Sequence, residues 1–143
     1  MKFKLKEGLL LGSATAATQI EGGDGNNNWA RFASEGKIND ATTPLRAADH
    51  YNLWRADTDL MADMGMQIYR LGIEWSRIEP ENGKFSNEAM AHYRDELTYL
   101  REKGIAPMLT LHHFTNPLWF EDMGGWCKKE SVDIFLRFFR ADI

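Results

Sequence analysis

The sequence has only one cysteine, Cys127, among its 143 residues. A single thiol cannot form a disulfide within the chain, and it excludes a cysteine-rich metal site. Scarcity of cysteine is typical of cytosolic proteins, so we expect a cytoplasmic location. The leucines at positions 9–11 are too short an apolar run for a secretion signal. No window approaches the roughly 20 apolar residues that a membrane span needs, so we expect no contact with a membrane.

The chain also lacks an excess of basic residues, since 17 Lys and Arg face 21 Asp and Glu and the net charge is −4. A chain with this balance repels phosphates, so we expect no nucleic-acid partner. The sequence contains no Walker motif, no Gly-x-Gly-x-x-Gly and no nucleophile elbow. Four histidines are present but lack the spacing of a known zinc motif. We therefore expect neither a metal nor a cofactor. The histidines are His50, His92, His112 and His113.

What the sequence does contain is three apolar stretches that each end in polar residues. Residues 8–13, 67–73 and 106–111 suit strands of a parallel sheet covered on both faces, because such strands carry near-continuous apolar runs. Helical patterns follow at 48–64, from a cap at Ser86 to Gly104, at 117–123 with Asn116 as the cap, and from Ser131 onward. This order predicts an α/β fold of three consecutive βα units.

The helix expected over residues 48–64 has an apolar stripe with polar residues between its members. We expect the stripe to be buried and the aspartates to lie on a solvated face. The stripe consists of Leu53, Ala56, Leu60, Met61 and Met64, and the aspartates are Asp57, Asp59 and Asp63.

The carboxyl ends of the three strands carry the residues that we expect to form a site, because ligands of parallel sheets bind there. Gln19 lies just past the first strand, and Arg70 is embedded in the second. Burial of an arginine is costly without an anionic partner, so Arg70 either faces a carboxylate in the site, which we favour, or lies on an exposed face of its strand. His113 and Phe114 follow the third strand, and alternation allows only one of His112 and His113 to face the site. An amide, an imidazole, a guanidinium and aromatics suit a polyhydroxylated ligand.

Four stretches of the sequence resemble the family 1 glycoside hydrolases, the group of β-glucosidases, β-galactosidases and 6-phospho-β-glycosidases. They are LGSATAATQIEG at 11–22, ADHY at 48–51, YRLGIEWSRIEP at 69–80 and TLHHFTNP at 110–117. The resemblance implies the (β/α)8 TIM barrel of that family, of which residues 1–143 are the amino-terminal portion with the first three βα units. As given, the barrel is incomplete, because it takes about 250 residues.

The resemblance also implies residue roles. It implies that Gln19 and His113 hydrogen-bond sugar hydroxyls in the glycone subsite and that Arg70 supports the nucleophilic carboxylate. Phe114 stands where many members have Trp, which keeps an apolar wall but removes an indole N–H. The family's retaining chemistry uses two glutamates, in a Thr-x-Asn-Glu-Pro motif after strand four and a Glu-Asn-Gly motif after strand seven. The sequence contains no Thr-x-Asn-Glu-Pro, and its Glu-Asn-Gly, at 81–83, lies in the turn after the second predicted strand and not after a seventh.

Glu21, Glu74 and Glu79 have no catalytic role in the family, so we expect them to be structural or to form salt bridges. We therefore expect part of a retaining β-glycosidase that contributes glycone-binding residues and is inactive as the 143-residue chain alone. The alternative is a non-catalytic sugar-binding or scaffold fragment. The expected partners are a β-glycoside and either the remaining barrel segment or a second copy, which would cover the open sheet edges. The sequence does not distinguish glucose, galactose and 6-phospho sugars.

Overall fold

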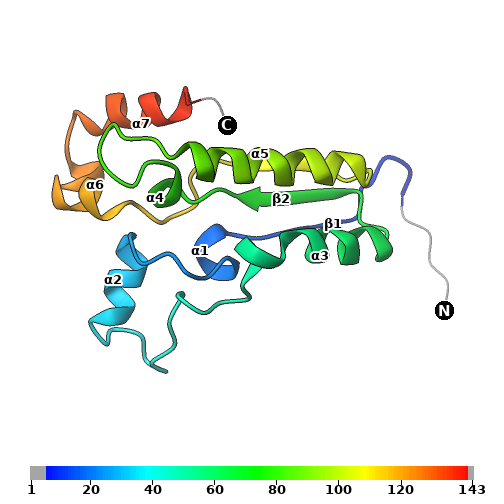
Figure 1. Ribbon diagram of the computed structural model, residues 1–143, viewed down its shortest axis with the longest axis horizontal. Helices are drawn as coiled ribbons and strands as arrows, with labels where there is room; N and C mark the ends of the chain where they lie inside the picture. The colour runs from blue at the N-terminus through cyan, green and yellow to red at the C-terminus, as the bar shows by residue number, and fades with distance from the viewer. Residues whose placement is uncertain (1–5, 142–143) are drawn as a thin grey trace.

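The computed structural model describes residues 6–141, and its centre is a parallel sheet of three strands (Figure 1). The strands are β1 (Gly12–Ala14), β2 (Ile68–Gly72) and β3 (Ala106–Thr110), in the order β1-β2-β3. Their register places Ala14 beside Arg70 and Arg70 beside Met108. The second and third strands lie within the predicted stretches, and all three carboxyl ends meet at one edge of the sheet.

Two long helices cover one face of this sheet. Helix α3 (His50–Asp63) joins β1 to β2, and α5 (Asn87–Glu102) joins β2 to β3. Two successive right-handed crossovers in the same direction place both helices on the same side. Tyr69 and Leu71 are buried beneath them, whereas Met108, on the opposite face, is 53% exposed. The expectation that both faces are covered is therefore wrong for residues 6–141, because neither crossover reaches the second face.

The first strand is shorter and begins later than predicted. The prediction was residues 8–13, but pairing begins at Gly12, and the three leucines before it are exposed. β1 lies at the edge of the sheet and pairs with β2. Its length is set by this pairing, because residues 12–14 are the ones that lie opposite residues 68–70 of β2. A Cβ at position 12 would clash with the carbonyl group of Ile68, so glycine permits the close approach.

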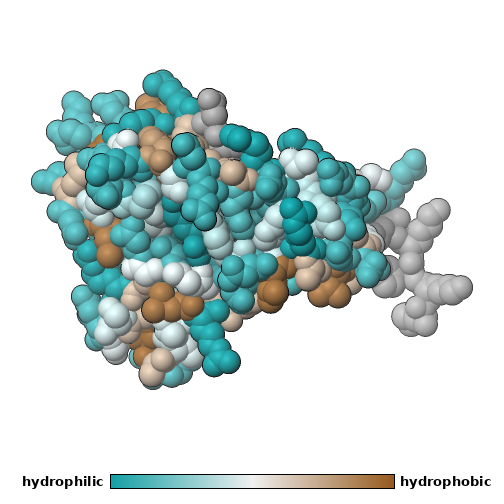
Figure 2. Space-filling view, viewed as in Figure 1, coloured by the Kyte–Doolittle hydropathy of each residue, from teal (hydrophilic) through white to brown (hydrophobic). Residues whose placement is uncertain are grey.

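Helix α3 buries a different face from the predicted one. Its buried residues are His50, Trp54, Thr58 and Met61. Leu53, Leu60 and Met64 of the predicted stripe are exposed, and apolar side chains emerge at the lower rim of the molecule near this helix (Figure 2). The helix carries two candidate stripes, and packing against Tyr69 of β2 and Leu100 of α5 selects the one that contains Met61.

The buried face of α3 also includes an ion-pair cluster. The Nδ1 atom of His50 lies 2.6 Å from Asp57, and its Nε2 atom lies 2.9 Å from Glu96 of α5. Asp57 was expected on a solvated face, yet it is only partly exposed and serves as one of these two partners. Because both ring nitrogens face carboxylates, both must donate, and the imidazole is a buried cation that links the two helices.

Helix α5 begins as predicted, because the hydroxyl of Ser86 accepts a hydrogen bond of 3.2 Å from the backbone of Ala89. Asn116, in contrast, does not cap the next helix. Pro117 occupies that position, and the Asn116 side chain donates to Glu121 and accepts from Trp126.

Shorter helices gather at the end of the molecule toward which β2 points (Figure 1). The sequence predicts two elements of this group, although the first is shorter than expected: α6 (Leu118–Asp122) and α7 (Ser131–Phe139). It does not predict the others, which are α1 (Ala17–Ile20), α2 (Asn28–Ser34), α4 (Trp75–Ile78) and the 3-10 helix η1 (Gly125–Cys127). Trp75 of α4 packs against Phe120 and Phe138, so a buried aromatic cluster holds this end together.

Candidate functional site

Arg70 and His113 meet at the carboxyl ends of β2 and β3. The Nη1 atom of Arg70 lies 3.0 Å from Nδ1 of His113 and 3.2 Å from the carbonyl oxygen of Thr15, which follows β1. The guanidinium therefore joins the ends of all three strands. Within residues 6–141 no carboxylate forms an ion pair with Arg70, so the predicted anionic partner of this side chain stays a prediction.

His112 and His113 have different surroundings, as the alternation of side chains predicts. His113 is exposed beside Arg70. His112 packs edge-on against Trp75 and Trp126, and its Nε2 atom lies 2.9 Å from Oδ1 of Asn116. His113 is thus the histidine available at the open strand ends.

Phe114 continues the same surface toward α2. Its ring meets Trp29 edge-on with centroids 5.6 Å apart, and it meets His113 at 5.2 Å. Gln19, on α1, is exposed. Helix α2 is positioned by Asn27, whose side chain accepts from the backbone of Ala30 at 2.9 Å. Trp29 is a contributor that the sequence does not identify, although the Asn27 cap is a signal that could have located its helix.

Behind this surface lies a buried network around Glu21. Arg77 donates from Nε to Glu21 at 2.7 Å, and the Tyr93 hydroxyl donates to the same carboxylate at 2.8 Å. Burial raises the pKa of Glu21 to about 7, and the charge of Arg77 limits the rise. Glu79 is likewise paired, with Arg137. The salt-bridge expectation is therefore confirmed for Glu21 and Glu79.

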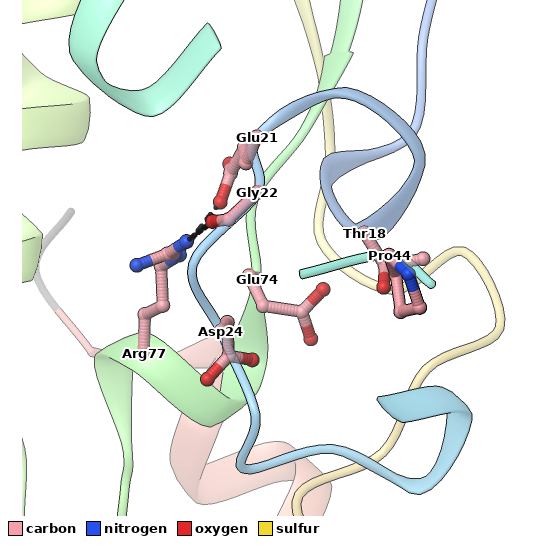
Figure 3. A pocket seen from close by; sticks show the side chains of 7 residues that line it. All are labelled: Thr18, Glu21, Gly22, Asp24, Pro44, Glu74 and Arg77. Atoms are coloured by element: carbon pink, nitrogen blue, oxygen red, sulfur yellow. Dashed lines mark hydrogen bonds and ion pairs between the residues drawn. The ribbon is translucent and has the colours of Figure 1, made fainter. Parts of the chain in front are cut away.

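Glu74 differs from these two glutamates because no cation pairs with it in the described part of the chain. Its carboxyl group contacts the hydroxyls of Ser76 and Thr115, each at 3.0 Å. In Figure 3 the carboxyl group of Glu74 points away from Arg77, which is turned toward Glu21 and Gly22. Burial, followed by the charges of Asp24 and Glu21, raises the pKa of Glu74 to about 8.

The exposed part of the site can donate and accept hydrogen bonds beside apolar ring faces. Its donors and acceptors are Arg70 and His113, and its rings are Phe114 and Trp29. Gln19 is exposed on α1, and its place in the same site stays a prediction. Residues 6–141 contain no group of three or more His, Cys, Asp or Glu placed to hold a metal. None of the helices described is long and apolar enough to cross a membrane.

Comparison with known proteins identifies relatives over nearly the whole chain. The family model for glycosyl hydrolase family 1 matches residues 1–141. β-Glucosidase A of Thermotoga maritima is 36% identical over 145 residues, which cover 96% of this chain and 32% of the relative. A β-glycosidase structure from Pyrococcus horikoshii is 39% identical with a TM-score of 0.85, covering 96% of this chain and 32% of the other. A rice β-glucosidase mutant in covalent complex with glucose is 40% identical with a TM-score of 0.87, covering 93% and 30%.

These comparisons confirm the predicted fold, since the sheet and its helices correspond to the first βα units of family 1 barrel enzymes. The chain spans about a third of the length of the curated relatives that it matches. The family match covers all but the last two residues of the sequence. The chain therefore belongs to glycosyl hydrolase family 1.

Proposed function

We propose that residues 1–143 are the amino-terminal portion of a retaining β-glycosidase barrel and form one wall of its glycone subsite. Gln19 and His113 hydrogen-bond sugar hydroxyls in this proposal, and Phe114 packs against the pyranose ring. Arg70 supports a nucleophilic carboxylate that another part of the barrel supplies. The observation that supports the proposal most strongly is the contact between Arg70 and His113 at the open strand ends.

The chemistry of this wall fits a sugar because sugar hydroxyls both donate and accept hydrogen bonds. The amide of Gln19 can do both, and a neutral His113 that accepts from Arg70 at Nδ1 presents an N–H at Nε2. Phe114 and Trp29 supply apolar ring surface beside these groups. The relatives named β-glucosidase and β-glycosidase support a β-glycoside as the substrate. The covalent glucose complex of the rice relative supports a retaining mechanism.

Residues 1–143 alone bind but do not hydrolyse in this proposal. The sequence has no Thr-x-Asn-Glu-Pro, and its Glu-Asn-Gly, at 81–83, lies in the turn before α5 and not after a seventh strand. The glutamates that follow β1 and β2, Glu21 and Glu74, are buried. The open sheet face and the apolar rim, with Met108 and Leu60 exposed, support a further segment that covers them. That segment is the remainder of the barrel, and self-association is the alternative. A cytoplasmic location stays a prediction.

The test is hydrolysis of a nitrophenyl β-glucoside by purified residues 1–143, alone and mixed with a polypeptide that carries strands four to eight of the Thermotoga maritima enzyme. We expect no turnover by the chain alone and turnover by the mixture. Turnover by the chain alone that Glu74→Gln abolishes would contradict the proposal. If the mixture stays inactive, calorimetric titration of the chain with glucose decides the alternative, because binding of glucose by the chain identifies a non-catalytic sugar-binding fragment.

A further inference from the structure

Glu74 is a fully buried carboxyl group whose contacts, apart from the backbone, are hydroxyls. Glu74 lies just past the carboxyl end of β2, and the exposed fraction of the residue is 1%. Ser76 Oγ lies 3.0 Å from its Oε1 atom, and Thr115 Oγ1 lies 3.0 Å from both carboxyl oxygens. A buried carboxylate without a cation is strongly disfavoured, so the protonation state of Glu74 needs an explanation.

Hydrogen counting at Ser76 supplies that explanation. The Oγ atom of Ser76 contacts two carboxyl groups, at 2.6 Å to Asp24 Oδ2 and 3.0 Å to Glu74 Oε1. A hydroxyl has one hydrogen and can donate to only one of them. The shorter contact is typical of donation to an ionised carboxylate, and Asp24 also accepts from Asn27 Nδ2 at 2.8 Å. The contact of 3.0 Å then requires a hydrogen on the carboxyl group of Glu74, which donates to Ser76 Oγ.

No water molecule in the space beside Glu74 can supply the missing hydrogen. The small space beside Glu74 is lined by Thr18, Glu21, Asp24 and Arg77, among others (Figure 3), and it does not admit a water-sized sphere. A buried water needs room of about one such sphere, so this side of Glu74 is dry. An open cavity of about 360 Å³ borders Asp24 and Ser76 from another side, but Glu74 does not line it. The same lack of room excludes a bound ion or ligand in this space.

The charged groups around Glu74 also favour a neutral carboxyl. Burial is the largest cause of the raised pKa of Glu74. The charges of its acidic neighbours, Asp24 and Glu21, raise the pKa further. Arg77 is committed to Glu21 and to the carbonyl of Gly22. The Tyr93 hydroxyl donates to Glu21 and accepts from the backbone N–H of Glu74, so it provides no donor to the Glu74 side chain.

We infer that Glu74 is kept as a neutral carboxylic acid, whose O–H donates to Ser76 while the Ser76 hydroxyl donates to Asp24, and that this chain of hydrogen bonds holds the proposed sugar-binding wall in place. Glu74 is thus a positioning residue. Thr115, which contacts Glu74, lies in the loop that carries His113 and Phe114. This role rests on the proposed function, whereas the protonation itself does not.

The geometry explains why one proton can control the wall. Asp24 also bonds Asn27, the cap of α2, and α2 carries Trp29, which contacts the ring of Phe114. Loss of the proton leaves Glu74 and Asp24 as two anions that share one hydroxyl hydrogen. Their repulsion separates the end of β2 from α2 and loosens the contact between Trp29 and Phe114.

The protonation is tested by carboxyl carbon NMR of residues 1–143 labelled at glutamate, with Glu74→Gln to assign the resonance. We expect a midpoint near 8, far above the ordinary value of 4.5, and a lower midpoint in Asp24→Asn because one negative charge is removed. Glu102→Gln, at an exposed position of α5, is the matched control and leaves the midpoint unchanged. A Glu74 midpoint near 4.5 would overturn the inference.

The positioning role is tested separately by the nuclear Overhauser contact between the rings of Trp29 and Phe114. We expect this contact to weaken above pH 8 in the unchanged chain and to persist in Glu74→Gln, whose amide has the shape of the neutral acid but does not titrate. The same pH dependence in both proteins would contradict the role. Failure of Glu74→Gln to fold at pH 6 would also contradict it, because the native state would then need the charge. Neither readout depends on sugar binding, so the proposed function can fail independently.

Discussion

The guanidinium of Arg70 lies 3.0 Å from Nδ1 of His113, across the neighbouring ends of β2 and β3. Arginine can only donate hydrogen bonds, so Nδ1 must accept and the ring hydrogen of the neutral imidazole must be on Nε2. This pair defines the chemical character of the wall. It turns His113 into a donor at the nitrogen that is free to meet a ligand.

The tautomer of His113 is the first prediction. Nitrogen NMR of residues 1–143 above the titration range of histidine will show hydrogen on Nε2, and Arg70→Met will give a mixture of tautomers because the donor to Nδ1 is gone. His112 is the internal control, since its Nε2 atom bonds Asn116 and not Arg70. An unchanged His113 spectrum in Arg70→Met would contradict the assignment.

The buried face of α3 and α5 gives a prediction for stability. Leu100 is fully buried, so Leu100→Ala will lower the free energy of unfolding by about 2–5 kcal/mol through lost burial and a cavity. Leu60 is 60% exposed, and Leu60→Ala will change it by no more than about 0.5 kcal/mol. Urea titration of both variants checks this. A loss at Leu60→Ala as large as that at Leu100→Ala would contradict the observed packing of α3, because it would show that Leu60 is buried.

The ion-pair cluster of His50 predicts a dependence of stability on pH. Burial lowers the pKa of His50, but hydrogen bonds and charges of Glu96 and Asp57 outweigh it and raise the pKa to about 9. The contribution is therefore complete below pH 6.5, the ordinary value, and is lost as pH rises through about 9. We expect a loss of about 2–3 kcal/mol across this window. Urea titration at each pH measures it as the difference between the unchanged chain and His50→Gln, and a constant difference would contradict it.

Phe114 provides a prediction about the sugar-binding wall. Phe114→Trp adds an indole N–H, so in an active assembly it will improve kcat/KM for a β-glucoside by about 0.5–1.5 kcal/mol, the typical net value of one hydrogen bond. Steady-state kinetics in the mixture with strands four to eight measures this change. Phe114→Leu keeps an apolar side chain without the donor and serves as the control. An equal effect of both substitutions would remove the hydrogen-bond explanation.

The sequence predicts those elements whose signals are local. The apolar run of β2 and the Ser86 cap of α5 both occur where expected. The buried face of α3 could not be chosen, because two stripes are possible and the choice depends on contacts with Tyr69 and Leu100. Helices α1 and α4 have four residues each, too few for a periodic pattern to identify.

The candidate site also contains residues that the sequence predicts and residues that it does not. Its exposed residues could be placed because parallel strands bring their carboxyl ends together, which puts Arg70 beside His113. The cluster of Asp24, Ser76 and Glu74 could not be predicted, since Ser76 and Asp24 are 52 residues apart and meet only in the folded chain. The expectation of a structural or salt-bridging role fits both glutamates, since Glu21 pairs with Arg77 and Glu74 is buried among hydroxyls.

The measurement that tests the account most directly is hydrolysis of a nitrophenyl β-glucoside by a chimera in which residues 1–143 replace the corresponding third of the Thermotoga maritima β-glucosidase A. We predict that the chimera is active, and that Gln19→Ala and His113→Ala each lower kcat/KM by about 2–3 kcal/mol with the melting temperature unchanged. A folded chimera that is inactive would contradict the account. So would substitutions that change only the melting temperature.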